Sequence, residues 1–486
     1  MRFFTGLLAA VAALAPGSQA DIPVHCTYPQ ITGKWTYQLY ATDDYSSCTA
    51  SEIDKQTATG SFTVTLSEPN VATDASGNTG TWTLVYDEGI MIELGGNKYF
   101  SYFEYEKKSD GTSTSFCGYS LGWMHEIVPG AASQPTQWQC IAGTAANADA
   151  RTSSFKVLDP IGSIPEDAVV EEKAELAARI NAAGLPWKAK AKPHFYGMKM
   201  RDAVRQMGVP LIKPPVELPK AAKVGAVDPT SLGLPSEFSW TNVSGVDFVP
   251  PVRHQDSCGS CYSFGSTEAM GARLRIQTNN ADTTVLSPQD VVTCSDQSQG
   301  CDGGFPMLVG FYAEAFGIVP EECFPYEGPI VNGTTSPDTC LQRKCKSPSN
   351  IYRTSEYGYT GGYYTGVTEE NMLTALVNTG PLAVSFNVTA AFQQYDGGVF
   401  VQPSAEVMGD DEFVFGITNH VVEIYGYGTL DGTPYWSVRN SWGTSWGLSG
   451  DFMIRRGTNE LNIETMAVSF GNVFAQSTAA SQIQQK

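Results

Sequence analysis

Two cysteines stand three residues apart in the stretch VRHQDSCGSCYSFGS, at Cys258 and Cys261. A pair with this spacing can be half of a zinc site, a redox-active dithiol, or one structural cysteine beside one catalytic cysteine. Zinc needs about four ligands, but the chain has no second CxxC pair and its five histidines are scattered. A redox dithiol belongs to a short βαβ unit, whereas this pair lies deep in a long chain. These observations argue against a metal site and against a redox site.

In the third interpretation, Cys258 forms a disulfide and Cys261 is the first residue of a helix predicted over 261–277. Unpaired amides and the helix dipole favour an anion at a helix N-terminus, so they lower the pKa of a thiol that lies there. A neighbouring imidazolium lowers this pKa further and leaves a nucleophilic thiolate. His420 is the best candidate for the imidazole, because it stands at the head of the predicted strand HVVEIYGYG in the same region.

Three more residues fit the same chemistry. The side-chain amide of Gln255 precedes the helix and can join the backbone N–H of the nucleophile in stabilising an oxyanion. Asn440 in RNSWGTSWG can orient the imidazole through its amide oxygen, and Trp442 can shield that contact from water. His254 is nearer in sequence to the cysteines and is the simpler alternative for the histidine.

The N-terminal stretch MRFFTGLLAAVAALAPGSQA has the form of a signal peptide, with one basic residue, a short apolar run and a small-x-small site that ends at Ala20. Cleavage there leaves Asp21 as the new N-terminus. The chain is therefore expected in the secretory pathway, where cysteines pair, and its eleven cysteines leave one thiol over. Glycosylation sequons suit this route and are found at Asn242, Asn332 and Asn387.

Composition narrows the class of protein further. The chain has 486 residues, 42% of them hydrophobic, so we expect a folded protein of two or three domains. Thirty basic residues against fifty acidic ones give a net charge of -20, which repels nucleic acid and anionic membranes. After the signal peptide, no segment has the roughly 18 apolar residues of a membrane span.

Three sections follow the signal peptide (1–20). Residues 21–143 contain alternating apolar segments such as SFTVTL and TWTLVY, which predict an antiparallel β domain. Residues 144–233 have no cysteine and include a predicted helix in EDAVVEEKAELAARINAAG, so they form either a linker or a removable pro-segment. Residues 234–486 are rich in glycine, aromatic residues and cysteine, and helices early with strands late predict an α+β domain of two lobes.

The motifs CGSCY, CDGGF, CFPYEG and NSWGTSWG together resemble the papain-type cysteine peptidases. With LPSEFSW, IRRGTNE and the N-terminal DIPVHCTYPQITGKW, the chain is similar to the dipeptidyl peptidase I, or cathepsin C, family. The resemblance implies a papain-like two-lobe peptidase domain, preceded by an antiparallel β-barrel exclusion domain and a partly helical pro-segment. It also implies a heavy chain of about 234–409 and a light chain of about 410–486 after cleavage.

For function, the resemblance implies a cysteine-type aminodipeptidase that removes N-terminal dipeptides through a thiolate acyl-enzyme. Cys261 would be the nucleophile, Gln255 an oxyanion donor, and His420 the acid and base oriented by Asn440. Asp21 would bind the free amino group of a peptide or protein substrate. The alternatives are a papain-like endopeptidase and a catalytically inactive, secreted, disulfide-rich binding protein.

The resemblance further implies a chloride ion held near Tyr359 and Phe305, no metal and no organic cofactor. The chain departs from the family at Met307, where a second chloride-binding tyrosine is usual, at His254, and at Asp451, where relatives show an aromatic residue. An activating protease, a homotetramer, and either secretion or a lysosome-like or vacuole-like acidic compartment are implied as well. The implied disulfides are Cys26–Cys117, Cys48–Cys140, Cys258–Cys301, Cys294–Cys340 and Cys323–Cys345.

Overall fold

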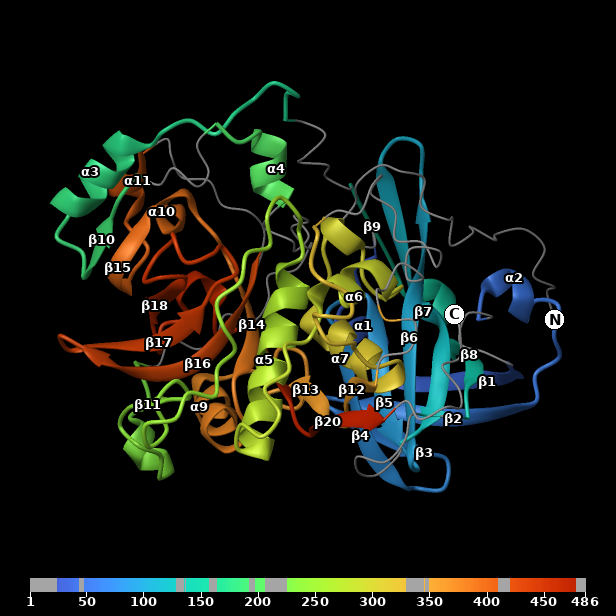
Figure 1. Ribbon diagram of the computed structural model, residues 1–486. Coiled ribbons are helices and arrows are strands. Elements are labelled where there is room, and N and C mark those ends of the chain that lie inside the picture. Colours follow the sequence, from blue (N-terminus) through green and yellow to red (C-terminus); the bar gives the residue numbers. More distant parts are fainter. Residues whose placement is uncertain are drawn as a thin grey trace.

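Figure 1 shows the computed structural model, in which a β-barrel lies beside a larger domain of two lobes. The structure describes residues 24–42, 48–127, 135, 137–156, 164–191, 197–205, 225–328, 345, 349–409 and 420–477. The predicted signal peptide, Asp21, Asn332 and Cys340 lie outside these ranges.

The barrel is built from eight antiparallel strands in the order β6-β5-β4-β3-β2-β1-β8-β7, and it closes because β7 pairs back with β6. Alternate residues point inward, and Trp35, Tyr37, Val64 and Leu66 fill the interior. The strands are β1 (Gly33–Ala41), β2 (Gly60–Ser67), β3 (Val71–Asp74), β4 (Thr79–Val85), β5 (Gly89–Leu94), β6 (Asn97–Lys107), β7 (Thr112–Glu126) and β8 (Gln139–Ala145).

The barrel sheet continues past residue 143, where the sequence placed its end. A ninth strand, β9 (Thr152–Lys156), pairs with the first half of β7. The sequence missed it because its two serines and its lysine interrupt the apolar alternation. Short helices lie around the barrel at α1 (Tyr28–Ile31), α2 (Ala50–Ile53) and η2 (Ala148–Ala150).

The segment after the barrel contains α3 (Ala174–Ala182), β10 (Trp187–Ala189) and α4 (Met200–Arg205). These parts of it lie on the two-lobe domain, α3 and β10 on the side away from the barrel and α4 above the middle of the molecule (Figure 1). β10 pairs antiparallel with β15 (Tyr395–Phe400) and so joins the sheet of the two-lobe domain. This segment is therefore packed against the domain rather than linking two separate bodies.

One lobe of the larger domain is mainly helical and the other contains a long sheet, with α5 (Cys261–Thr278) between them. The sheet order is β10-β15-β18-β17-β16-β14-β19-β13, with β11 on β16. The helical lobe holds α6 (Pro288–Cys294), η4 (Gly300–Asp302) and α7 (Pro306–Ala315). The sheet lobe adds β11 (Phe238–Ser239), β13 (Tyr357–Tyr359), β14 (Leu382–Phe386), β16 (His420–Leu430), β17 (Thr433–Arg439), β18 (Asp451–Arg455) and β19 (Met466–Phe470).

The two-lobe domain also contains one further strand pair and several short helices. β12 (Asn350–Thr354) and β20 (Val473–Ser477) pair with each other as a separate ribbon. The short elements are η3 (Pro229–Leu232), α9 (Glu369–Asn378), α10 (Ala390–Gln393), α11 (Ala405–Met408) and η6 (Glu460–Asn462). None of the described helices is long and apolar enough to cross a membrane.

Buried polar contacts hold the barrel against the two-lobe domain. Nζ of Lys98 on β6 lies 2.9 Å from both carboxylate oxygens of Glu314 on α7, and the lysine is only 3% exposed. The hydroxyl of Tyr28 donates to the Tyr364 carbonyl at 2.7 Å. A buried ion pair of this kind is costly to break by removing one partner. The position of the barrel is therefore set by specific contacts.

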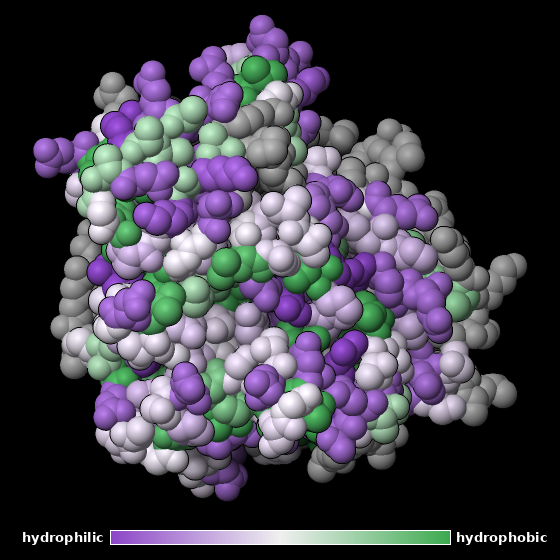
Figure 2. Space-filling model, turned by 60° about the vertical axis from the view of Figure 1, so that its left-hand side comes forward, coloured by the Kyte–Doolittle hydropathy of each residue, from purple (hydrophilic) through white to green (hydrophobic). Residues whose placement is uncertain are grey.

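Hydrophobic and hydrophilic residues are mixed over the face of the molecule in Figure 2, and the green groups there are small. The large hydrophobic side chains with the highest exposure, such as Val71, Val169 and Leu448, belong to different sections of the chain. Scattered single residues of this kind are normal for a folded surface.

Candidate active site

Cys261 is the first residue of α5, as the sequence predicts. The loop before it is fixed by the Cys258–Cys301 disulfide and by a hydrogen bond from the Gly259 amide to the Cys301 carbonyl at 2.9 Å. Among the described residues Cys261 is the one free cysteine. The start of α5 therefore carries a single thiol on a rigid loop.

α5 approaches β16 closely at the turn that follows the thiol. A Cβ at Gly265 would lie 2.9 Å from Cγ1 of Val421, a distance that side-chain carbons essentially never show. Val421 follows His420, the first residue of β16. Since Cys261 begins α5 and His420 begins β16, this contact brings the thiol and the imidazole toward each other.

His420 is oriented by Asn440, which follows the end of β17. Nε2 of the ring lies 2.8 Å from Oδ1 of Asn440, and that oxygen also accepts the Ser441 amide at 2.8 Å. The Trp442 ring stacks on the imidazole with centroids 4.9 Å apart. His420, Asn440 and Trp442 are fully buried. Nδ1 has no hydrogen-bond partner among the described residues, so it is the ring nitrogen that can face the thiol.

Gln255 is held beside this set by three contacts. Its Oε1 accepts the Ser441 hydroxyl at 2.6 Å, and its Nε2 donates to the Cys258 carbonyl at 2.9 Å. The backbone N–H of Gln255 donates to the Ser441 carbonyl at 2.9 Å. A side-chain amide that is fixed in this way needs little reorganisation when it stabilises a developing charge.

Burial shifts the pKa values of the thiol and the imidazole. Desolvation raises the pKa of Cys261 to about 12, although the amides of Val421 and Tyr262 oppose the shift. Burial lowers the pKa of His420 to about 4, and the hydrogen bond to Asn440 opposes that shift. In this buried site, desolvation therefore opposes the lowering of the thiol pKa that the helix N-terminus favours.

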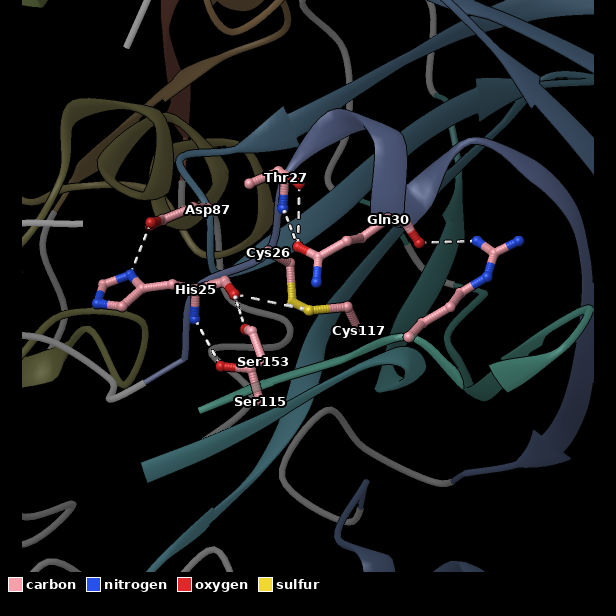
Figure 3. The surroundings of a disulfide bond; sticks show 9 residues. His25, Cys26, Thr27, Gln30, Asp87, Ser115, Cys117 and Ser153 are labelled. Carbon is pink, nitrogen blue, oxygen red and sulfur yellow. Dashed lines mark hydrogen bonds and ion pairs between the residues drawn. A yellow bond between two sulfur atoms is a disulfide. The ribbon is translucent and has the colours of Figure 1, made fainter. Parts of the chain in front are cut away.

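The first described residues of the barrel are anchored at several points around a disulfide (Figure 3). The His25 amide donates to Oγ of Ser115 at 2.8 Å, and Nδ1 of His25 lies 2.6 Å from Oδ2 of Asp87. The next residue forms the Cys26–Cys117 disulfide. The chain that follows the predicted N-terminus is therefore held firmly to the barrel wall.

A series of aromatic contacts connects the barrel with the start of α5. Tyr86, in the turn between β4 and β5, stacks on Phe305 with ring centroids 3.8 Å apart. Phe305 follows Gly304, where a Cβ would lie 2.7 Å from the Tyr262 ring. Tyr262 is next to Cys261 in α5. The barrel thus reaches the residues that adjoin the nucleophile. Tyr262, Gly304 and Phe305 with their neighbours are called the wall below.

The chloride implied by the resemblance would meet fewer side-chain donors at this wall than the resemblance requires. Tyr359 is buried, and its hydroxyl accepts the Tyr86 amide at 3.2 Å, which leaves the hydroxyl proton to be donated. The buried Met307 offers a thioether, which is a weak acceptor and no donor. The Phe305 side chain has no polar group, and its ring is covered by Tyr86. One tyrosine hydroxyl therefore stands in place of the pair that the resemblance implies. Within the described residues no group of three metal-binding side chains occurs either.

Comparison with known proteins identifies the family. Residues 234–470 match the model of the papain family cysteine proteases, and residues 21–145 match that of the cathepsin C exclusion domain. Cathepsin C of Schistosoma mansoni is 32% identical over 464 residues, which cover 93% of this chain and 96% of that protein. The chain belongs to the cathepsin C family of papain-like cysteine proteases.

Other relatives of this cathepsin C family chain match a smaller part of it. Cathepsin B of Dictyostelium discoideum is 30% identical over 254 residues, which cover 50% of this chain and 78% of that protein. Among solved structures, procathepsin B S9 from Trypanosoma congolense has a TM-score of 0.49 at 24% identity and covers 64% of this chain and 100% of that one.

Four of the five disulfides implied by the cathepsin C resemblance are present. In addition to the two described above, the structure contains Cys48–Cys140 and Cys323–Cys345. Cys294 is not free, and its implied partner Cys340 lies outside the described residues.

The predicted glycosylation sites differ in accessibility. Asn242 is exposed, and its side chain accepts the Gly245 amide at 3.0 Å. Asn387 is only 6% exposed, so its burial disfavours a glycan on the folded chain. Its sequon lies at the end of a buried strand, and the tripeptide alone carries no information about burial. Asn332 lies outside the described residues.

Sequence reasoning missed two residues that support this cathepsin C family site. Ser441 holds Gln255 from both sides, as its hydroxyl donates to the glutamine side chain and its carbonyl accepts the glutamine amide. Tyr326 donates to the Gln255 carbonyl at 2.7 Å and contacts Oγ of Ser260, the residue before the nucleophile. The only feature of the sequence that could have pointed to them is their place in a motif, which is NSWG for Ser441 and CFPYEG for Tyr326.

Proposed function

We propose that this enzyme removes dipeptides from the free N-termini of peptides and proteins. The observation that carries the proposal is the contact series from Tyr86 through Phe305 and Gly304 to Tyr262, beside the nucleophile. In this proposal, a barrel fixed against this wall closes the substrate cleft of the processed enzyme on one side of Cys261. An endopeptidase needs a cleft that is open on both sides of the scissile bond, whereas a closed end favours substrates that terminate there.

Asp21 is proposed as the group that recognises the substrate N-terminus. Val24 is fully buried and His25 is anchored to Ser115 and Asp87. Three residues span at most about 10 Å, so the backbone of Asp21 would lie within about that distance of Val24. A carboxylate that accepts charge-assisted hydrogen bonds from an ammonium group would select free N-termini.

The site geometry supports the following reaction. The Cys261 thiolate attacks the carbonyl carbon of the second substrate residue, and the Gln255 amide with the Cys261 N–H stabilises the oxyanion. The imidazolium of His420 protonates the leaving amine as the C–N bond breaks, which leaves a thioester. His420 then takes a proton from water, the hydroxide attacks the thioester, and the dipeptide leaves with a free carboxylate.

The segment with α3 and β10 is proposed as an activation pro-segment. Trp187 is 2% exposed, its Nε1 donates to the Val401 carbonyl at 2.9 Å, and its ring lies 4.8 Å from that of Phe400. A separate protease would cut near Leu234 and near Asp410, and water admitted to the site would then favour the thiolate–imidazolium pair. Assembly as a homotetramer, and an acidic lysosome-like or vacuole-like compartment or secretion, belong to the same proposal.

The test compares two substrates of the processed enzyme, a dipeptide amide with a free amino group and the same compound with that group blocked. We expect kcat/KM for the free compound to be higher by about 100-fold or more, because a charge-assisted contact to the ammonium is lost on blocking. Equal turnover of both compounds would favour the endopeptidase. No turnover, together with no labelling of Cys261 by a thiol-directed epoxide, would favour the inactive binding protein.

Chloride is expected to have little effect on this enzyme. With the buried Met307 in place of a second hydroxyl donor, replacing chloride by acetate at constant ionic strength should change kcat/KM by less than about twofold. Titration of the processed enzyme with chloride at a fixed dipeptide amide concentration measures this. A saturable rise in activity with chloride would mean that the wall binds the ion after all.

A further inference from the structure

A row of charged side chains crosses the sheet of the peptidase domain beneath the active site. Glu423 on β16 pairs in register with Arg439 on β17, and Arg439 pairs with Asp451 on β18. Nε of Arg439 lies 2.9 Å from Oδ1 of Asp451, and Nη2 lies 3.0 Å from Oδ2. This bidentate contact satisfies Asp451, but it leaves Glu423 with neither carboxylate oxygen hydrogen-bonded, although the side chain is fully buried.

A second carboxyl group faces Glu423 from α5. Glu268 follows Gly265 by three residues, so it lies on the same side of the helix, the side that contacts Val421 on β16. Glu423 follows Val421 by two residues and points to the same face of the strand. Glu268 is 4% exposed, and its Oε1 has no hydrogen-bond partner among the described residues. Two carboxyl groups are thus buried at the contact between α5 and β16.

Among the residues that the structure describes, too few cations face this carboxyl pair to neutralise it. Arg439 is engaged by Asp451, and Arg253 forms an ion pair with Glu321. The charged or titratable groups around the pair are Arg275 on α5, Tyr425 on β16, Arg439 on β17, Asp451 on β18, and Asp247 and Arg253 on the preceding loop. If all of these carboxyl groups were ionised, their negative charges would outnumber the arginines that are not already paired. The excess negative charge can then be removed only by protonation of the carboxyl groups.

We propose that Glu268 and Glu423 act as positioning residues that carry protons in the folded enzyme and thereby keep α5 seated on β16. These two elements begin with Cys261 and His420, the proposed nucleophile and base. Glu268 is seven residues from Cys261, which is about 10 Å along the helix axis. When both carboxyl groups ionise, their repulsion acts directly on the contact that aligns the thiol with the imidazole. The pair therefore destabilises the active arrangement as the pH rises through the range in which the two groups lose their protons.

The direction of the pH dependence follows from the shifted pKa values. Burial raises the pKa of Glu268 from 4.5 to about 8 and raises that of Glu423 well above 4.5, and the charge of Glu268 adds to the shift of Glu423. Between pH 4.5 and about 8 the folded chain binds more protons at these sites than the unfolded chain does. The stability they contribute is complete at acidic pH and is lost as the pH rises through this window.

The test uses the processed enzyme and the isosteric variants Glu268→Gln, Glu423→Gln and the double variant, which imitate the protonated state at every pH. The midpoint of urea unfolding and the rate of Cys261 labelling by a thiol-directed epoxide are measured at about pH 5 and about pH 7.5. We expect the wild-type midpoint to fall between these two values. In the double variant, the difference between the two midpoints should be at most half of the wild-type difference. The labelling rate supplies the link to the active site, whereas the urea midpoint does not depend on the proposed catalytic roles.

Glu464→Gln is the matched control. Glu464 is also a buried glutamate, but its oxygens accept from Trp436, Gly457 and Asn459. It should lower the midpoint without reducing the pH difference. A double variant that keeps the full wild-type pH difference, or one that is destabilised equally at both pH values, would overturn the proposal. If the variants fail to fold, the wild type alone decides, because a midpoint that is unchanged or higher at about pH 7.5 contradicts proton-dependent stability.

Discussion

Replacing Cys261 by alanine is expected to lower kcat/KM for a free dipeptide amide by about 10⁵-fold to 10⁶-fold, and replacing His420 by alanine by a similar factor. The thiol and the imidazole act as one unit, so the double variant should lose little more than either single variant. This follows from the geometry, in which Asn440 holds Nε2 of the ring and leaves Nδ1 for the thiol. The measurement is steady-state turnover by the processed enzyme, with epoxide labelling as an independent readout of the thiol.

His254→Ala is the control for the histidine assignment. This side chain is 37% exposed, and its Nδ1 accepts the Asp256 amide at 2.9 Å. Its replacement should change kcat/KM by less than about threefold, as is usual for a surface residue. The assignment of His420 would be wrong if His420→Ala kept more than about 1% of the activity while His254→Ala lost it.

Replacing Asp21 by asparagine is expected to remove the preference for substrates with a free amino group. Loss of one partner of a desolvated charge pair costs about 2 to 5 kcal/mol, which corresponds to a fall in kcat/KM of about 30-fold to several thousand-fold. Turnover of the amino-blocked compound should stay within about threefold of wild type, because it makes no contact with the carboxylate. The ratio of the two kcat/KM values is the quantity to measure.

Two control variants test whether the loss of preference is specific to the Asp21 carboxylate and its position. Asp54→Asn changes an exposed acid on the same barrel and should leave the ratio unchanged. Addition of one residue before Asp21 keeps the carboxylate but displaces the N-terminus, and it should reduce the preference for free amino groups. If Asp21→Asn kept the full preference, another group would have to bind the substrate N-terminus, while the Cys261 and His420 predictions would be unaffected.

The sequence predicted the elements of the site well where a local signal was strong. The helix over 261–277 was expected and is present as α5 (Cys261–Thr278), and the strand HVVEIYGYG is β16. Such agreement is understandable, because helix starts and apolar strands are encoded over a few neighbouring residues. β9 has a mixed polar sequence and was missed, since only its pairing with β7 makes it a strand.

Glu423 stands out in the sequence, but the sequence alone does not show what it contacts. It is the one charged residue in the apolar run HVVEIYGYG, and this is unusual for a buried strand. Asp451 was recognised as a departure from the family pattern. Neither observation could place Glu268 opposite Glu423, because that contact joins a helix and a strand more than a hundred residues apart.

The sequence alone determined the identity of the chemistry: a single thiol outside the disulfides, the residue types that could activate it, and the family to which the motifs belong. These depend on side-chain types and on the parity of the cysteines, which need no coordinates. The tertiary structure decided the burial of Cys261 and His420, the approach of Tyr86 to the wall beside the nucleophile, and the burial of Glu268 against Glu423. The physical reason is that desolvation and charge proximity are set by segments distant in sequence, and here desolvation opposes the effect of the local helix N-terminus on the thiol pKa.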